Sequence, residues 1–177
     1  MKRIDMSNVE SATDYKRLVP GGYVCKITGV KDVADKEYLE VEYDIAEGEF
    51  KDYYLSLFQS KQFWGGKTYK SYSDKGLPFF KAFIETVEES NRGWIWNWNE
   101  SVLRGCYVGF VLGEEEYNKQ DGTVGKHLAV QKILPVDKIR KGEFTVPGLK
   151  QLNKTTSYSS LPPSGSLSPI NNDDLPF

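Results

Sequence analysis

The sequence is poor in the side chains that build metal centres and disulfide frameworks. Its 177 residues include one histidine, His127, and two cysteines, Cys25 and Cys106. The first residues lack the apolar run of a signal peptide, and no stretch approaches the ~18 consecutive apolar residues of a membrane span. We therefore expect a cytoplasmic protein with no membrane association, in which both cysteines stay reduced and buried.

An excess of basic charge is also missing. The formal net charge is −2, which excludes a globally basic nucleic-acid-binding surface, so any surface that binds anions must be a local patch. No motif predicts a cofactor or a metal ion. What the sequence does contain is 39% hydrophobic and 14% aromatic residues, and this composition supports a globular core.

Composition divides the chain into three parts. Residues 1–18 are polar and predict a loosely held arm, and residues 19–149 carry the periodic apolar patterns of a folded domain. Residues 150–177 are rich in Ser, Thr, Pro and Gly. Because such a segment has almost nothing to bury, we expect it to be a disordered tail.

Hydrophobic periodicity predicts a mainly β domain. Apolar residues alternate with polar ones most clearly in 37–45, and residues 23–30, 50–58, 105–113 and 127–136 also favour strands. Residues 77–91 have apolar side chains at helical spacing, with a proline near the start. The order of three strands, a helix and two strands predicts an OB-fold, a five-stranded Greek-key barrel with one helix between strands 3 and 4.

The segment 61–75 is the main candidate for binding single-stranded nucleic acid. It interleaves lysines with aromatic residues, and lysines can follow phosphates while aromatic faces stack on bases of any sequence. We expect this segment to be a loop that works together with the preceding strand. The predicted contact residues are Tyr54, Phe58, Lys61, Trp64, Lys67, Tyr69, Lys70 and Tyr72. The alternative for Trp64 is that its side chain packs in the interior of the barrel.

Three other patterns bear on this hypothesis. Trp94, Trp96 and Trp98 either stack on bases or cap the barrel beside the phenylalanine-rich helix, and capping is favoured. The outward carboxylates of the strand at 37–45 would repel phosphate, so either DNA runs on the side of the next strand or the register expected for the barrel is wrong. The run of carboxylates at 114–116 suggests either a nuclease metal site or the charged surface of a hairpin, and the hairpin is favoured because adjacent carboxylates cannot all converge on one ion.

Two parts of the sequence resemble known families. The final residues, Asp173, Asp174, Leu175, Pro176 and Phe177, resemble the acidic C-terminal tip of bacterial single-stranded-DNA-binding proteins. The segments "VPGGYVCKI", "YLEVEYDIAEGEFKDYY", "LPFFKAFI" and "GFVLGEEEY" are similar to a family of phage and prophage proteins from Gram-positive hosts that often carries the same label.

These resemblances imply a non-enzymatic protein that coats single-stranded DNA during phage replication or recombination. They also imply that the tip recruits host or phage replication and recombination proteins. Two alternatives remain open at this point: a recombination accessory protein that anneals strands, and a metal-dependent nuclease. The sequence also leaves open whether the protein forms a homo-oligomer.

Overall fold

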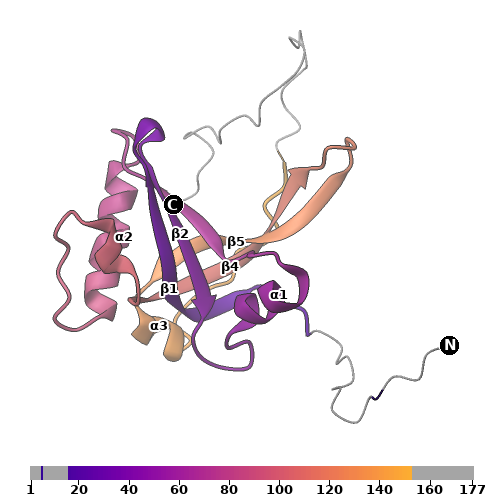
Figure 1. Cartoon of the computed structure of the whole chain (residues 1–177), viewed down its shortest axis with the longest axis horizontal. Coiled ribbons are helices and arrows are strands. Elements are labelled where there is room, and N and C mark those ends of the chain that lie inside the picture. Colours follow the sequence, from indigo (N-terminus) through magenta and orange to yellow (C-terminus); the bar gives the residue numbers. More distant parts are fainter. Residues whose placement is uncertain (1–4, 6–15, 153–177) are drawn as a thin grey trace, which may run out of the picture.

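The chain folds around one five-stranded antiparallel sheet. The computed structural model describes residue 5 and residues 16–152. The strands are β1 (Gly21–Val33), β2 (Tyr38–Ile45), β3 (Lys67–Ser71), β4 (Tyr107–Asn118) and β5 (Val124–Leu134). Their order in the sheet is β3-β2-β1-β4-β5, and the sheet does not close, so β3 and β5 are its two edges. The strands β4 and β5 cross the direction of β1 and β2 and form a long hairpin (Figure 1). The predicted mainly β architecture is therefore confirmed.

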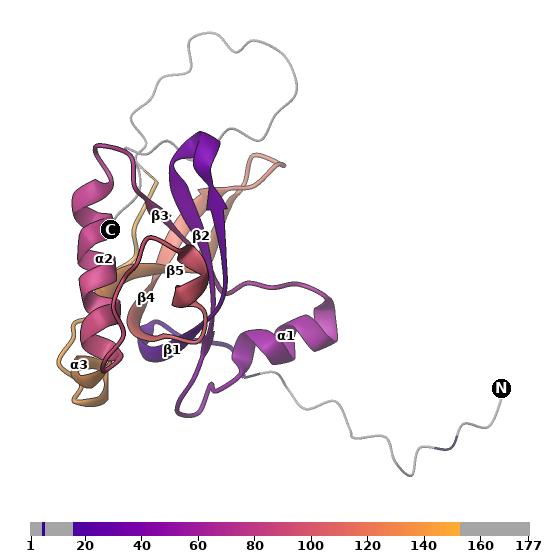
Figure 2. The ribbon, with the colours of Figure 1, turned by 60° about the vertical axis from the view of Figure 1, so that its left-hand side comes forward.

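Three α-helices surround this sheet. They are α1 (Tyr53–Lys61), α2 (Leu77–Ser90) and α3 (Val136–Arg140), and short 3-10 turns cover Ala34–Lys36 and Glu100–Leu103. Figure 2 shows α2 standing along one side of the sheet, while α1 projects from the other side. The helix predicted at 77–91 is confirmed, and it begins with Pro78 in its first turn, where the missing N–H has no intrahelical partner to lose.

The main core lies between the concave face of the sheet and α2. Its fully buried members come from β1, β2, β4, α2 and the 3-10 turn at Glu100–Leu103, and they include Ile27, Val41, Tyr43, Phe83, Val87, Leu103, Val108, Phe110 and Leu112. A smaller cluster under α3 contains Val24, Val111, Val136 and Ile139. The alternation of β2 holds as far as Tyr43: Leu39, Val41 and Tyr43 are buried, and Tyr38, Glu40 and Glu42 are half-buried, whereas Asp44 at the end of the strand is buried as well.

The predicted strand at 50–58 is wrong, because this part of the chain enters helix α1. The buried carboxylate of Asp44 explains why. It accepts hydrogen bonds from the backbone N–H groups of Tyr54 and Leu55, both at 2.9 Å. The first turn of a helix leaves such donors without partners, and here the acceptor comes from the end of β2. An acceptor supplied from outside the helix cannot be recognised in the pattern of 50–58.

The predicted loop at 61–75 is also wrong in part, since residues 67–71 form β3. This strand pairs with β2, with Leu39 opposite Lys70 and Glu40 opposite Tyr69. The free edge of β2 provides backbone partners to a segment whose own composition is too polar to indicate a strand. The order of the five strands along the chain is unchanged, and the helix α1 is inserted between β2 and β3.

Residues at both predicted domain boundaries contact the folded domain. Leu18 is only 7% exposed and belongs to the core. At the other end, Lys150 forms a bridge beside β4: its N–H donates to the carbonyl of Glu114 at 2.9 Å, and its carbonyl accepts from the N–H of Glu116 at 3.0 Å. The predicted tip at 173–177 lies outside the described residues. Among the helices of the described part, none has the length and hydropathy needed to cross a membrane.

Candidate functional site

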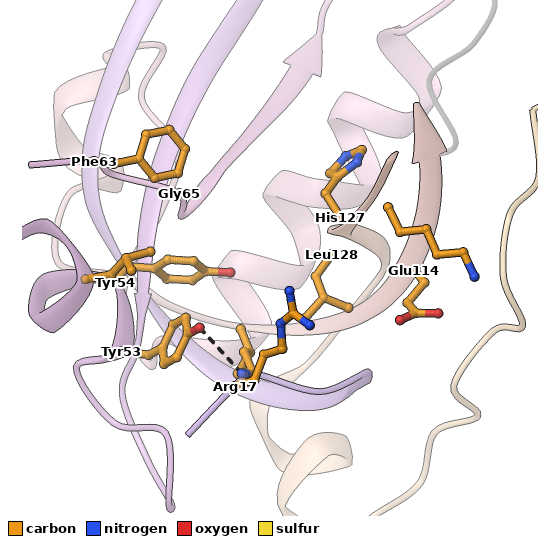
Figure 3. Close-up of a pocket in the computed structure, with 11 residues that line it drawn as sticks. Arg17, Tyr53, Tyr54, Phe63, Gly65, Glu114, His127 and Leu128 are labelled. Atoms are coloured by element: carbon orange, nitrogen blue, oxygen red, sulfur yellow. Dashed lines mark hydrogen bonds between the residues drawn. The ribbon is translucent and has the colours of Figure 1, made fainter. Parts of the chain in front are cut away.

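A groove of about 580 Å³ lies between helix α1 and the hairpin of β4 and β5. One wall consists of α1 and the loop that follows it, and the other wall consists of the two strands (Figure 3). Arg17 and Leu18, which precede β1, form its end. We call this cavity the α1 groove. It brings together three segments that are far apart in the sequence.

The α1 wall of the groove is aromatic. Figure 3 shows Tyr53, Tyr54 and Phe63 on this side, with the ring of Tyr54 directed toward the opposite wall. Tyr54 is only 5% exposed and packs edge-on against Tyr43 at 5.5 Å, so it is part of the core as well as of the wall. Phe63 is 62% exposed. This wall therefore offers one accessible ring, Phe63, above two rings that are held in place by packing.

The opposite wall carries most of the groove's charge. Lys126 and His127 lie at the beginning of β5 and are exposed, and Arg17 reaches the groove from the N-terminal side. Among the described residues that line the groove, Glu114 is the only carboxylate. Two permanent cations against one carboxylate make the groove a local basic patch on a chain whose net charge is −2.

The outward face of β2 and β3 is a second surface with accessible aromatic side chains. Tyr38 and Tyr69 are half-buried there and meet edge-to-face with ring centroids 5.4 Å apart. Lys67 lies beside them and contacts the carboxylates of Glu40 at 2.6 Å and Glu42 at 3.1 Å. The hydrogen bond to Glu40 raises the pKa of Lys67. The one positive charge of Lys67 offsets one of the two negative charges of Glu40 and Glu42, and these ion pairs also occupy the lysine.

The structure distributes the eight predicted contact residues over several places. Tyr54 lines the α1 groove, Phe58 and Lys61 are exposed on α1, and Lys67 and Tyr69 lie on the outward face of β2 and β3. Trp64 is half-buried, and its indole N–H donates to the carbonyl of Gly66 at 3.1 Å. Tyr72 donates its hydroxyl hydrogen to Asp32 at 2.7 Å, on the side of α2. Lys70 lies inside the domain.

The position of Lys70 corrects the expected geometry of the segment. Its side chain is 4% exposed, and its amine lies 5.6 Å from the ring centre of Phe83 and 5.8 Å from that of Phe110. Burial lowers the pKa of Lys70 to about 7. Neighbouring residues of a strand point to opposite faces, so Tyr69 and Lys70 cannot lie on the same surface. In this conformation Lys70 offers nothing to a phosphate outside the domain.

The carboxylates at 114–116 point to different partners. Glu114 faces the α1 groove (Figure 3). Glu115 lies 3.8 Å from the amine of Lys150, and Glu116 accepts a hydrogen bond from the backbone N–H of Leu152 at 3.3 Å. Within residues 16–152 no group of three His, Cys, Asp or Glu side chains is arranged to hold a metal ion. A nuclease centre built on these glutamates would need a different arrangement of the hairpin.

Sequence reasoning missed most of the groove. The predicted set contains only Tyr54 among the lining residues, and it omits Arg17, Phe63, Lys126 and His127. Phe63 lies within the aromatic and basic segment that was singled out, so a signal for it existed. Lys126 and His127 were hidden because they lie at the beginning of a strand whose position relative to α1 is set by the packing of the sheet, not by the local sequence.

Comparison with known proteins identifies no relative. A scan of the sequence against protein-family models finds no match, and a search of curated proteins finds none that is similar to this chain. The evidence for a function therefore comes from the side chains and the fold described above.

Proposed function

We propose that the protein binds single-stranded DNA, without sequence preference and without catalysing a reaction, and that the α1 groove is its principal contact surface. The observation that carries this proposal is the juxtaposition of an exposed ring, Phe63, with the cations Arg17 and Lys126 across one groove. Unpaired bases expose a π-face that any aromatic ring can stack on, and the phosphates that connect them need cations nearby. A duplex hides those faces, so this combination favours single strands.

The order of the strands supports the proposal. An OB-fold is a five-stranded, partly open Greek-key barrel that binds oligonucleotides on the face of strands 2 and 3 and with the loops next to it. We propose that the order β3-β2-β1-β4-β5, with α2 between β3 and β4, represents an OB-type barrel left open between β3 and β5. In this arrangement the hairpin of β4 and β5 supplies Lys126 and His127. A single strand of DNA that leaves the groove then continues over Tyr38 and Tyr69.

Binding of a labelled thymidine oligonucleotide to the full chain, followed by fluorescence anisotropy, tests the proposal. We expect stronger binding to the single strand than to a duplex of equal length, and a logarithm of affinity that falls linearly with the logarithm of salt concentration. Replacing both groove cations, Arg17→Gln with Lys126→Gln, should weaken binding and flatten the salt dependence. Lys138→Gln, an exposed lysine on α3, is the matched control and should change neither. Equal affinity for duplex and single strand would contradict the proposal.

We also propose that residues 173–177 recruit replication or recombination proteins of the host or phage. These residues lie outside the described part of the chain, and the support is chemical: two aspartates stand beside Leu175, Pro176 and Phe177, which suits a partner with a basic rim and one apolar pocket. Deleting 173–177 should abolish the capture of such proteins from a host extract while oligonucleotide binding is retained. Undiminished capture by the truncated chain would remove this part of the proposal.

A further inference from the structure

A second cavity, of about 290 Å³, lies beside the beginning of α2. We call it the α2 pocket. Its apolar lining is largely aromatic, and its polar lining consists of carboxylates and one hydroxyl; the residues that matter below are Asp32, Tyr72, Phe80, Trp96, Trp98 and Glu100. No lysine or arginine is among the described residues that line it. The segment between α2 and β4, which contributes the tryptophans, lies next to α2 in Figure 2.

The four rings of the α2 pocket form a continuous series. Tyr72 and Phe80 meet edge-to-face at 5.9 Å, Phe80 and Trp96 meet edge-to-face at 6.1 Å, and Trp96 and Trp98 are tilted at 6.2 Å. Phe80 is 5% exposed and anchors the series in the core. The pocket is therefore lined by rings that contact one another in series, and the face of an aromatic ring attracts a cation.

Trp98, at the open end of the series, is held in an unusual position. Its side chain is 80% exposed, and its backbone has a φ of 63°, in the left-handed region that bulky residues avoid. An exposed loop can usually change its backbone conformation and relieve such strain, so a strained conformation that persists suggests a functional role. A strained residue with an exposed apolar side chain at the rim of a pocket points to a contact with a ligand.

The charge around the α2 pocket is negative. Asp32 accepts the hydroxyl hydrogen of Tyr72 at 2.7 Å, and Glu100 lines the pocket near Trp98. The hydrogen bond to Asp32 is the main cause that raises the pKa of Tyr72 to about 12. A phosphate would be repelled here, and a cation would be attracted both by the carboxylates and by the rings.

Trp96 adds a requirement of its own. Its indole N–H is buried and has no hydrogen-bond acceptor among the described residues. A buried donor without a partner is destabilising, and it is usually satisfied by a ligand or by water.

We propose that the α2 pocket binds an arginine side chain of a partner polypeptide. The planar guanidinium group stacks on the ring of Trp98 and donates hydrogen bonds to the carboxylates of Asp32 and Glu100. Arginine suits this site better than lysine because its flat, delocalised cation stacks on aromatic faces and still presents donors at its edge. This proposal does not depend on the binding of DNA in the α1 groove.

Indole N–H signals of the ¹⁵N-labelled full chain test this proposal, because the sequence has only four tryptophans. Titration with N-acetyl-arginine methylamide should move the signals of Trp96 and Trp98 and leave that of Trp64 in place. The citrulline analogue, which is isosteric and uncharged, should bind at least tenfold more weakly. Trp98→Ala and Glu100→Gln should each lower the affinity for the arginine probe at least fivefold.

Ile95→Ala is the matched control, since Ile95 is 77% exposed on the same segment and does not line the pocket; it should leave the titration unchanged. Equal binding of the citrulline and arginine probes would overturn the proposal, as would an unchanged affinity in both Trp98→Ala and Glu100→Gln. A cytidine oligonucleotide that moves the signals of Trp96 and Trp98 at lower concentration than the arginine probe would assign the pocket to nucleic acid instead.

Discussion

The α1 groove and the α2 pocket are both lined by aromatic rings, but their charges are opposite. Arg17 and Lys126 face the rings of the groove, whereas Asp32 and Glu100 accompany the rings of the pocket. Aromatic faces accept many planar ligands, including bases and guanidinium groups. The ligands that we propose for the two sites therefore differ because their charged neighbours differ. On a chain of net charge −2, this separation of charge allows one domain to present an anion-binding and a cation-binding surface.

The largest expected effect comes from a substitution that removes the support of one wall of the α1 groove and leaves the α2 pocket intact. Asp44→Ala removes the acceptor for the first N–H groups of α1, the helix that forms one wall of the groove. Losing these charge-assisted hydrogen bonds should lower the free energy of unfolding by about 3 to 4 kcal/mol. Urea denaturation measures this effect. In protein that remains folded, binding of the thymidine oligonucleotide should be lost while the arginine probe still binds, and loss of both together would show that the two regions are not independent.

The second prediction concerns Lys70, a buried amine among aromatic rings for which the described residues provide no ion-pair partner. Burial lowers its pKa from 10.5 to about 7 in the folded chain, so between these values the unfolded chain holds a proton that the folded chain does not. The resulting destabilisation is complete below pH 7 and disappears as the pH rises toward 10.5. Lys70→Met should therefore raise the free energy of unfolding by about 2 to 3 kcal/mol at pH 6 and leave it nearly unchanged near pH 10.

Urea denaturation of both proteins at these two pH values measures the difference. The comparison is made between variant and parent at each pH, because other groups titrate over the same range. A Lys70→Met variant that is less stable than the parent at pH 6 would contradict the assignment of Lys70 to the interior.

The third prediction separates the two sites directly. Phe63→Ala should weaken binding of the thymidine oligonucleotide by about 1 to 3 kcal/mol, the usual effect of losing one stacked base, without changing the arginine titration. Trp98→Ala should have the reverse pattern. Anisotropy and indole signals from the same two preparations measure both ligands. If each variant affected both ligands equally, the distinction between an anionic-ligand site and a cationic-ligand site would be wrong.

The smallest expected effect comes from the one carboxylate in the groove. Glu114→Gln should tighten oligonucleotide binding by about 0.5 kcal/mol, because removing a partly exposed like charge near a phosphate has a modest effect that salt screens. Anisotropy at two salt concentrations measures it, and the gain should shrink at the higher one. Glu89→Gln, on α2, is the matched control for removal of a negative charge elsewhere. Weaker binding by Glu114→Gln would mean that the carboxylate contacts the ligand favourably.

Several parts of this structure could be predicted from local pattern. The alternation of Leu39, Val41 and Tyr43 predicted β2, and the helical spacing of Phe80, Phe83 and Val87 predicted α2. Both patterns succeed because each segment buries one face, and burial of one face imposes the period of the element on the sequence. The aromatic and basic segment at 61–75 was likewise recognised as unusual, although its lysines and rings do not lie on one surface.

The failures share one physical cause, which is that the deciding partner lies elsewhere in the chain. Helix α1 begins where it does because Asp44 accepts its first N–H groups, and β3 forms because β2 has a free edge. The pattern of 61–75 predicts Lys70 on the surface beside two tyrosines, whereas in β3 its side chain lies on the opposite, buried face. None of these influences can be read in a window of ten residues.

By itself, the sequence determined a mainly β domain with one long helix and an unusual supply of aromatic side chains, because burial periodicity and composition are local properties. Only the tertiary structure decided which rings meet which charges. Arg17, Phe63 and Lys126 come together across the α1 groove, and Asp32, Trp98 and Glu100 come together around the α2 pocket. The curvature of the sheet and the packing of the two helices bring these distant residues within reach of each other, and such contacts leave no periodic signal in the sequence.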